Sequence, residues 1–329
     1  PGHSNGKSQT EKEKDKPPQR SRSGRIQTLG PVANLEQHVR SDWWRGIFNS
    51  LYLKTDADVV EDSHITRQEV GLFADLLKLS PEDKILDLCC GQGRHSLELA
   101  RRGQKNVEGL DRSHYLIQRG KMIARKEALG VKFREGDARK LPYPTDHFDV
   151  VVILGNSFGY FDSVEDDLRV LKEVCRVLKP WGRLLIDVTD GDYIRRKFEP
   201  RSWEWIDKKH FVCRERSLSA DGQRLISREV ISNVEKGLLA DQFYAERLYT
   251  PESISDLLRN AGFNDTVVHN SLSPESQRNQ DLGMMERRIV VTSVVRKEWS
   301  CVKKKLKLAH RRVVVIQGDP TKPDPTKPM

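Results

Sequence analysis

The sequence predicts an α/β fold built on a doubly wound, mostly parallel β-sheet. Between residues 85 and 188, short apolar segments typical of buried strands alternate with longer segments of helical periodicity. Strands and helices that alternate in this way form parallel βαβ units, because each helix crosses the sheet to reach the next strand. Two further observations define the layout: strand-like segments alone follow residue 202, and both ends of the chain are poor in apolar residues.

The elements of the alternating region follow one another in a regular order. Short apolar runs predict strands, and apolar residues that recur every three to four positions predict helices. We expect strands at 85–88, 106–110, 131–134, 148–154 and 183–188. Helices are expected at 66–79, 94–102, 115–129 and 166–178.

Residues 202–249 predict an antiparallel insertion that lies over the sheet. The strand-like segments are 210–218, 224–234 and 242–249, and Asp221-Gly222 is a strong signal for a hairpin turn. Thr250 is placed to cap a helix that has Pro251 at its first position and ends at Gly262. Residues 288–295 are expected to close the main sheet as its last strand.

An aromatic segment before the sheet predicts an N-terminal helical cap over 35–54. Its apolar residues recur at helical spacing after a capping residue at Ser41 or Asp42: Trp43, Trp44, Ile47, Phe48 and Leu51. We therefore expect a disordered basic tail at 1–34, a globular domain at 35–298 with a lid insertion at 202–249, and a second basic, disordered tail at 299–329. The tails hold too few apolar residues to offset the entropy lost on folding, and the second contains a DPTKP tandem repeat.

The charge of the chain is concentrated at its ends. The net charge of +9 divides into +4 for residues 1–40, +7 for residues 296–329 and −2 for the residues between them. A nearly neutral central region argues against a basic nucleic-acid groove, so nucleic acid is a candidate partner only for the tails.

Composition also bears on the compartment. The five cysteines are odd in number and form no CxxC pair, which favours a reducing compartment and predicts neither a disulfide framework nor a metal site. No apolar run is long enough to cross a bilayer, and the N-terminal residues lack the apolar core of a secretory signal. We expect a cytoplasmic protein without a membrane partner. The basic cluster between residues 303 and 312 leaves a nuclear location open.

A glycine-containing turn marks the candidate binding site. The run from Asp87 to Gly93 lies between the first strand and the following helix, where a ligand approaches the backbone at the carboxyl ends of the strands. Asp111, at the end of the second strand, is placed to accept hydrogen bonds from the two hydroxyl groups of a ribose. Together they predict an adenosine-type ligand, and they do not separate NAD from S-adenosylmethionine.

A third motif distinguishes these two ligands. Gly136-Asp137-Ala138 follows the third strand, and the chain then carries further motifs in a fixed order: ILDLCCGQG at 85–93, GLD at 109–111, EGDARKLPY at 135–143, HFDVVV at 147–152 and LKPWGRLLIDV at 178–188. In this order the chain resembles class I S-adenosylmethionine-dependent methyltransferases over roughly residues 40–295. The resemblance extends to microbial methyltransferases with the layout WW…LDLCCGQGRHS. The antiparallel insertion is similar to that of small-molecule N-methyltransferases such as the glycine and sarcosine enzymes. The resemblance to class I methyltransferases implies a Rossmann-like, seven-stranded sheet, S-adenosyl-L-methionine as cofactor and methyl transfer to an acceptor.

The resemblance also assigns roles to residues. Asp87, Gly91 and Gly93 would lie beside the methionine part of the cofactor, Asp111 would hold the ribose and Asp137 the adenine amino group. Many members have glycine where this chain has Cys89, whose thiol we expect to pack in the core. The full expected set of cofactor contacts is Tyr52, Asp87, Cys89, Gly91, Gly93, Asp111, Arg112, Asp137, Ala138 and Asn156.

Methyl transfer requires the nucleophile to be held in line with the methyl group, about 3–3.5 Å away, and a base only where the nucleophile begins protonated. The candidate catalytic residues are Asn156, Tyr160 and His210, with His210 as the base. Arg94 and His95, at the start of a helix, are candidates for contact with the cofactor carboxylate or an acidic acceptor.

The expected acceptor is a small molecule. The loop Gly155–Tyr160 lacks the NPPY sequence of enzymes that methylate amide or nucleobase amino groups. We expect a lidded cavity bounded by the N-terminal cap, the insertion and residues 156–160. The aromatic residues available for its wall are Trp43, Trp44, Tyr52, Phe158, Tyr160, Trp203 and Trp205.

Three alternatives remain open at this point. An NAD-dependent oxidoreductase would need a GxGxxG turn, and Ser96 occupies the position of its last glycine. A methyltransferase directed at RNA or protein would use the basic tails. A regulatory protein would bind the cofactor without turnover. The sequence does not indicate an oligomeric state.

Overall fold

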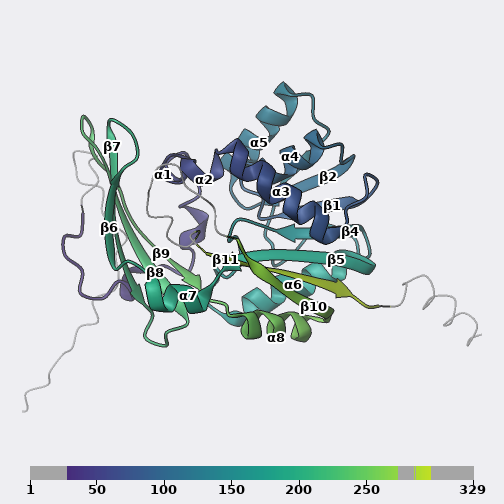
Figure 1. The fold of residues 1–329 in the computed structure, drawn as a ribbon. Coiled ribbons are helices and arrows are strands. Elements are labelled where there is room, and N and C mark those ends of the chain that lie inside the picture. Colours follow the sequence, from purple (N-terminus) through teal and green to yellow (C-terminus); the bar gives the residue numbers. More distant parts are fainter. Residues whose placement is uncertain (1–27, 273–284, 286, 298–329) are drawn as a thin grey trace, which may run out of the picture.

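The computed structural model describes residues 28–272, 285 and 287–297, shown as a coloured ribbon in Figure 1. The predictions of disorder for residues 1–27 and for the C-terminal tail lie outside these residues. Among the described helices none is long and apolar enough to cross a membrane.

The central element is a seven-stranded, mostly parallel sheet, which confirms the predicted fold class. Its strands lie in the order β10-β11-β5-β4-β1-β2-β3. Neighbouring strands from β1 to β5 pair in parallel, and β11 runs antiparallel to both β5 and β10. The strands are β1 Lys84–Leu88, β2 Asn106–Asp111, β3 Lys132–Glu135, β4 Phe148–Ile153, β5 Leu178–Thr189, β10 Phe263–Leu272 and β11 Arg288–Val295. Strand β10 was not predicted.

Helices cover both faces of this sheet, so the side chains of each strand are buried in alternation on two sides (Figure 1). On β1, Ile85 packs under α3 while Leu86 packs on the opposite side, under α6 and α8. The helices are α3 Ser63–Leu77, α4 Arg94–Arg101, α5 His114–Lys126, α6 Val164–Val177, α7 Gly191–Lys197 and α8 Pro251–Ala261. Because strands β1 to β5 are parallel, their carboxyl ends lie at the same end of the sheet. In α/β sheets covered by helices on both faces, ligands bind there.

Local sequence signals explain where the helices begin and end. Asp62 caps α3 by accepting hydrogen bonds from the backbone N–H groups of His64 and Ile65. Thr250 caps α8 in a reciprocal arrangement with Ser253, and Gly262 ends that helix at φ +98°. The predictions at Thr250, Pro251 and Gly262 are confirmed.

The insertion forms a separate antiparallel sheet, which we call the lid. Its strands are β6 Arg201–Trp205, β7 His210–Leu218, β8 Arg224–Asn233 and β9 Gly237–Arg247, in that order. Gly222 turns between β7 and β8 at φ +68°, as the Asp221-Gly222 signal predicts. The lid stands beside the end of the main sheet (Figure 1).

The prediction of one helix over 35–54 is wrong. The segment instead contains two 3-10 turns, Glu36–His38 and Trp43–Arg45, and the start of a single-turn helix, α1 Tyr52–Thr55. A second single-turn helix, α2 Ala57–Val60, follows it. Asn49 interrupts the helical pattern because its side chain closes a turn: Nδ2 donates to Gly46 O at 2.8 Å and Oδ1 accepts from Leu51 N at 2.8 Å. The aromatic side chains of this segment therefore contact several different elements and do not line one face of a single helix.

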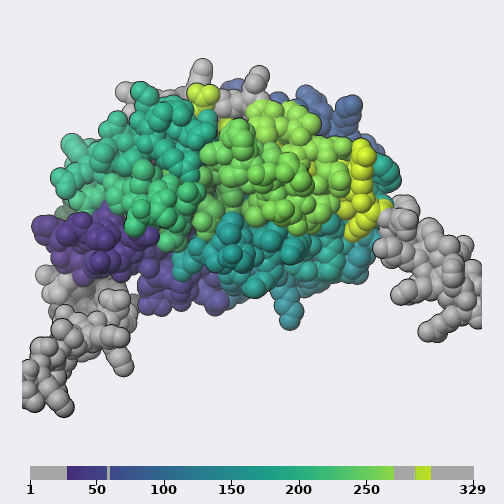
Figure 2. All heavy atoms as spheres, turned by 90° about the horizontal axis from the view of Figure 1, so that it is seen from below, coloured from purple at the N-terminus to yellow at the C-terminus, as the bar shows by residue number. Residues whose placement is uncertain are grey.

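The folded body also begins before the expected boundary at residue 35. Leu29 N donates to Asp241 Oδ2 at 3.0 Å, and Arg228 Nη1 donates to Gly30 O at 2.8 Å. Val32 packs against buried apolar residues of the lid. Figure 2 shows this N-terminal segment, in purple, against the lid strands, in teal and green.

Candidate functional site

Two adjoining cavities lie where the strand ends, the N-terminal segment and the lid meet. We call the first the strand-end cavity; it is lined by Trp44, Phe48, Tyr52, Cys89, Gly91, Leu110, Asp111, Arg112, Leu116, Gly136, Asp137, Ala138, Ser157, Phe158, Gly159, Tyr160, Phe161 and Val170. The second, the lid cavity, is lined by Trp43, Ile47, Thr55, Asp56, Val60, Cys90, Gln92, Arg94, His95, Leu154, Gly155, Asn156, Arg214, Arg216, Ser227, Glu229, Gln242, Tyr244, Glu246 and Met285, together with the shared residues. The shared residues are Phe48, Tyr52, Cys89, Gly91, Ser157 and Tyr160.

The glycine turn forms the wall between β1 and the two cavities. Gly91 has φ +57°, and a Cβ atom there would meet only Leu116 Cδ1, at 3.8 Å, so the backbone faces open space. Cys89 has φ +60°, in the left-handed region that costs an L-residue about 1–2 kcal/mol. This conformation explains why glycine suits position 89. The chain keeps the turn with a cysteine whose buried thiol has a pKa raised by desolvation.

Two predicted contacts of this turn lie behind the cavity wall. Asp87 is buried and accepts a hydrogen bond from Ser96 Oγ at 2.6 Å. Burial raises the pKa of Asp87 to about 7. Gly93 faces the ring of Phe133, which a Cβ atom at this position would approach to 2.3 Å. Their roles are to hold the turn, and the structure does not bring either residue to the lining of the two cavities.

Asp111 lies at the floor of the strand-end cavity, at the end of β2. Its Oδ2 accepts from Gly91 N at 2.8 Å, and its Oδ1 accepts from Ser113 N at 2.7 Å. Burial raises the pKa of this carboxyl group, and the backbone hydrogen bonds oppose the shift. Each carboxylate oxygen has a further lone pair, so Asp111 can still accept hydrogen bonds from a diol. Arg112 lies beside it and donates to Glu135 Oε1 at 3.1 Å.

Asp137 and Ala138 line the same cavity at the end of β3, as predicted. Arg139, which the sequence analysis missed, holds the Asp137 carboxylate: Nη2 donates to Oδ2 at 2.7 Å and Nε to Oδ1 at 3.0 Å. These hydrogen bonds hold the pKa of Asp137 below its usual range. The Arg139 guanidinium also lies over the rings of Trp44 and Phe161, at 5.3 and 4.4 Å from their centroids.

The N-terminal segment closes over these cavities through two backbone anchors. Ser113 Oγ donates to Phe48 O at 2.7 Å, and Gln92 Nε2 donates to Val60 O at 2.9 Å. Tyr52 lines both cavities, and its ring meets that of Phe48 edge to face at 5.1 Å. Burial raises the pKa of Tyr52, which keeps its hydroxyl protonated.

Asn156 and Tyr160 lie where they were expected, after β4. Asn156 has φ +55° and ties three elements together: its Oδ1 accepts from Thr189 N at 2.9 Å, and its Nδ2 donates to Glu246 Oε1 at 3.4 Å. Tyr160 packs between Trp43 and Phe48, at ring distances of 5.3 and 5.7 Å. Asn156 is therefore a positioning residue, whereas Tyr160 stands in the wall common to both cavities.

His210, the expected base, is not among the residues that line either cavity. It lies at the start of β7, where Lys54 Nζ is 3.5 Å from its Nδ1. Its Nδ1 contacts Asp207 at 2.8 Å, and its Nε2 contacts Asn233 Nδ2 at 2.8 Å. Both ring nitrogens are thus engaged within the lid.

Trp203 and Trp205 do not wall the lid cavity as expected. They lie on β6, and their side chains are 67% and 50% exposed. Strand β6 is an edge of the lid, and its alternating residues turn these two rings outward. Neither residue is among those that line the two cavities.

The lid presents polar side chains to the cavity that sequence analysis missed. They occupy every second position of three strands: Arg214 and Arg216 on β7, Ser227 and Glu229 on β8, and Gln242, Tyr244 and Glu246 on β9. Residues two apart in a strand point to the same face. This spacing is the signal that could have identified them, since the strands themselves were predicted.

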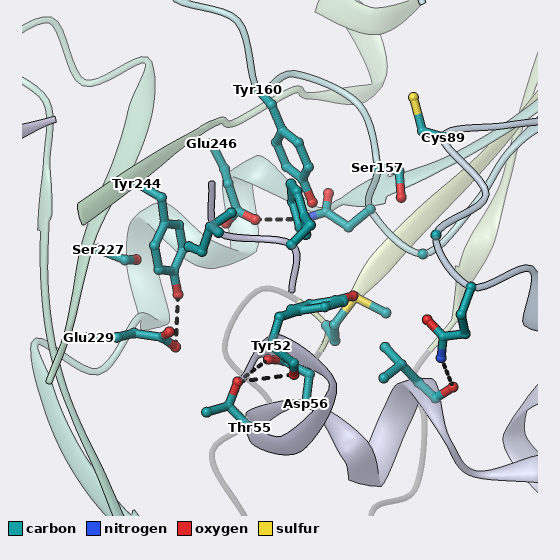
Figure 3. Close-up of a pocket in the computed structure, with 18 of the residues that line it drawn as sticks. Tyr52, Thr55, Asp56, Cys89, Ser157, Tyr160, Ser227, Glu229, Tyr244 and Glu246 are labelled. Carbon is teal, nitrogen blue, oxygen red and sulfur yellow. Dashed lines mark hydrogen bonds between the residues drawn. The ribbon is translucent and has the colours of Figure 1, made fainter. Parts of the chain in front are cut away.

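Hydrogen bonds order most of these lid residues (Figure 3). Glu229 accepts from Arg214 Nε at 2.9 Å, Gln242 Nε2 at 3.0 Å and the Tyr244 hydroxyl at 3.3 Å. Arg214 also pairs with Glu204. The lid is therefore preorganised by its own charges before an acceptor binds.

A buried ion network supports the glycine turn from below. Arg288 of β11 pairs with Glu69 of α3 and with Asp187 of β5. Glu69 also pairs with Arg94 and contacts His95 Nε2 at 2.9 Å. Desolvation lowers the pKa of His95 to about 4, so its ring is neutral. Arg94 and His95 line the lid cavity, while Glu69 fixes their side chains.

Comparison with known proteins identifies the central part of the chain. Residues 85–182 match a family described as a methyltransferase domain. The chain is similar to YqeM of Bacillus subtilis (strain 168), with 29% identity over 56% of this chain and 75% of that one. It is 30% identical to the 27-O-demethylrifamycin SV methyltransferase of Amycolatopsis mediterranei (strain S699), over 56% of this chain and 60% of that enzyme. This chain thus spans less than two thirds of the rifamycin enzyme.

The fold is shared with solved structures. One is an S-adenosylmethionine-dependent methyltransferase from Clostridium acetobutylicum ATCC 824, with a TM-score of 0.60 and 19% identity. The match covers 75% of this chain and 97% of that one. At this identity the likeness shows the fold alone, and the site residues rest on their own geometry.

Proposed function

We propose that this chain, a class I S-adenosylmethionine-dependent methyltransferase, transfers the methyl group of its cofactor to a small molecule held in the lid cavity. One observation carries the proposal: the strand-end cavity and the lid cavity meet at Tyr52, Cys89, Gly91 and Tyr160. A cofactor in the first cavity therefore faces an acceptor in the second across a short, shared wall.

The residues of the strand-end cavity fit the adenosine part of S-adenosylmethionine. Asp111 offers partly buried carboxylate lone pairs to the ribose hydroxyls, and the partly exposed Asp137 offers them to the adenine amino group. Leu116 and Ala138 supply apolar contacts for the adenine ring. Because Gly91 has no side chain, its backbone leaves room for the methionine part of the cofactor.

When bound, the cofactor supplies a methyl group already activated by its positive sulfur. The chain itself encloses the cofactor and the acceptor, orients them toward each other and excludes water. Phe48 and Tyr52 close the top of the site through the anchors at Ser113 and Gln92. Tyr160 fixes the boundary between the cavities by packing against Trp43.

An enclosed acceptor site favours a small molecule over a macromolecule. The lid strands and the N-terminal segment together surround the cavity, whereas a nucleic acid needs an open groove. The similarity to an enzyme named for 27-O-demethylrifamycin SV supports the same class of acceptor.

Asp111→Ala tests the cofactor half of this proposal. We expect it to weaken binding of S-adenosylhomocysteine by about 1.5–3 kcal/mol, or roughly ten- to hundredfold, because hydrogen bonds to a charged group are lost. It should also lower thermal stability, since Gly91 N and Ser113 N lose their acceptor. Isothermal calorimetry and thermal unfolding measure the two effects.

Asp149→Ala is the matched control. Asp149 accepts a backbone hydrogen bond from Lys84 N at 3.0 Å and pairs with Lys179, but it lies at the start of β4, whereas the cavities lie at the carboxyl ends of the strands. It should affect stability and leave the affinity unchanged. Equal affinities for the wild type and Asp111→Ala, or NAD binding as tight as that of S-adenosylhomocysteine, would contradict the proposal.

A further inference from the structure

Glu246 of β9 has a buried oxygen with no partner among the residues that the structure describes. The side chain is 8% exposed and lines the lid cavity. Its Oε1 accepts from Asn156 Nδ2 at 3.4 Å, whereas its Oε2 makes no hydrogen bond with the described residues. A buried polar atom without a partner is costly, so such an atom in a cavity wall indicates a ligand group that completes it.

The surroundings of Glu246 favour a positively charged or proton-donating group. Figure 3 shows Glu246 pointing from the lid toward Tyr160, with Tyr52 and Asp56 on the other side of the cavity. Asp56 is a second carboxylate in the lining, and its Oδ2 accepts from Thr55 Oγ1 at 2.7 Å. A cation gains from carboxylates and from the faces of aromatic rings together.

Arg214 and Arg216 make hydrogen bonds or ion pairs with groups other than Glu246, although Arg216 lies near enough to lower the pKa of Glu246. Arg214 is divided between Glu204 and Glu229. Arg216 Nη1 donates to Glu199 O at 3.1 Å and to Ser202 Oγ at 3.4 Å. Neither of these contacts involves Glu246.

We propose that Glu246 binds the nucleophilic nitrogen of a primary or secondary amine acceptor and takes a proton from it. The inference rests on the proposed function and specifies its substrate class. An ammonium group donates one proton to Glu246 Oε2, which leaves a lone pair on nitrogen. The nitrogen then forms the new N–C bond as the bond between methyl carbon and sulfur breaks, and that electron pair remains on sulfur. The positive charge ends on the methylated nitrogen, and Glu246 loses its proton to water when the product leaves.

The electrostatics of the cavity are consistent with a base that works near neutral pH. Desolvation, together with the nearby charges of Asp56 and Glu229, raises the pKa of Glu246 to about 8, and the charge of Arg216 opposes this shift. Tyr52 and Tyr160 also face Glu246, and burial raises the pKa of each, so both stay neutral. A catalytic base of this kind transfers protons best when its pKa lies near the working pH.

A pair of probes of equal shape tests the inference. Cyclohexylamine and cyclohexanol differ only in the group that would meet Glu246, and their binding can be measured by calorimetry at about pH 8 with the protein saturated with S-adenosylhomocysteine. We expect cyclohexylamine to bind about tenfold tighter or more, as for a charge-assisted hydrogen bond. Glu246→Gln should reduce the amine affinity by about tenfold and change the alcohol affinity by less than about twofold.

Controls separate this inference from the proposed function. Glu235→Gln removes a carboxylate that pairs with Lys209 on the lid surface and should leave both probes unaffected. Intact S-adenosylhomocysteine binding in Glu246→Gln shows that the variant is folded. Equal affinities for the two probes, or an amine preference that survives in Glu246→Gln, would overturn the role of Glu246. Failure of the wild type to bind S-adenosylhomocysteine would overturn the proposed function, and this inference with it.

Discussion

Arg288→Met is expected to lower the free energy of unfolding by about 3–5 kcal/mol, the range for breaking a buried ion pair. The Arg288 side chain is 1% exposed and pairs with both Glu69 and Asp187. Methionine fills much of the volume but leaves the buried carboxylate of Asp187 without its paired cation, and Glu69 keeps only its ion pair with Arg94. Because Glu69 also holds Arg94 and His95, the loss should reach the helix start behind the glycine turn.

Arg296→Met serves as the comparison for this variant. Arg296 lies just after the same strand and pairs with Asp265, but both side chains are about half exposed. An exposed pair contributes at most about 1 kcal/mol. Chemical denaturation measures the free energy of unfolding of both variants. Equal values for Arg288→Met and Arg296→Met would contradict the account.

Gly93→Ala is expected to destabilise the protein by about 3 kcal/mol or more. A residue with a side chain at φ +78° costs about 1–2 kcal/mol. The new Cβ atom would also lie 2.3 Å from the buried ring of Phe133, and overpacking of this kind adds about 1–3 kcal/mol. Movement of the Phe133 ring would displace the turn, so affinity for S-adenosylhomocysteine should fall as well.

Gly222→Ala isolates the backbone part of this effect. Gly222 has φ +68°, yet no atom lies within 4 Å of the position that its Cβ would occupy. It should cost only about 1–2 kcal/mol, with no change in cofactor affinity. Equal losses of stability for the two variants would show that the contact with Phe133 adds nothing to the cost of Gly93→Ala.

The sheet and the strand-end cavity could be predicted from sequence because local signals determine them. The buried strand at 85–88 is apolar except for Asp87, Asp111 is the last residue of β2, and Asp137 lies two residues after the end of β3. Residues at adjacent parallel strand ends meet at one edge whatever the loops do. The motif could not reveal that Asp87 is turned toward Ser96, since that depends on the packing of α4.

The acceptor side was predicted less well because it depends on contacts between distant segments. The spacing of Trp43, Trp44 and Phe48 fits a helix, but Asn49 and packing against Tyr160 override the pattern. The lid was predicted as strands, whereas its inward face was not assigned. Aromatic content therefore suggested Trp203, and the period of two along β9 that leads to Glu246 was overlooked.

A crystal structure with S-adenosylhomocysteine tests the central claim most directly. The account predicts ribose hydroxyls within about 2.6–3.2 Å of the Asp111 carboxylate and the adenine beside Asp137 and Ala138. The sulfur should lie at the junction formed by Cys89, Gly91 and Tyr160, open toward the lid cavity. A product bound outside the strand-end cavity, or with its sulfur turned away from the lid, would contradict the account.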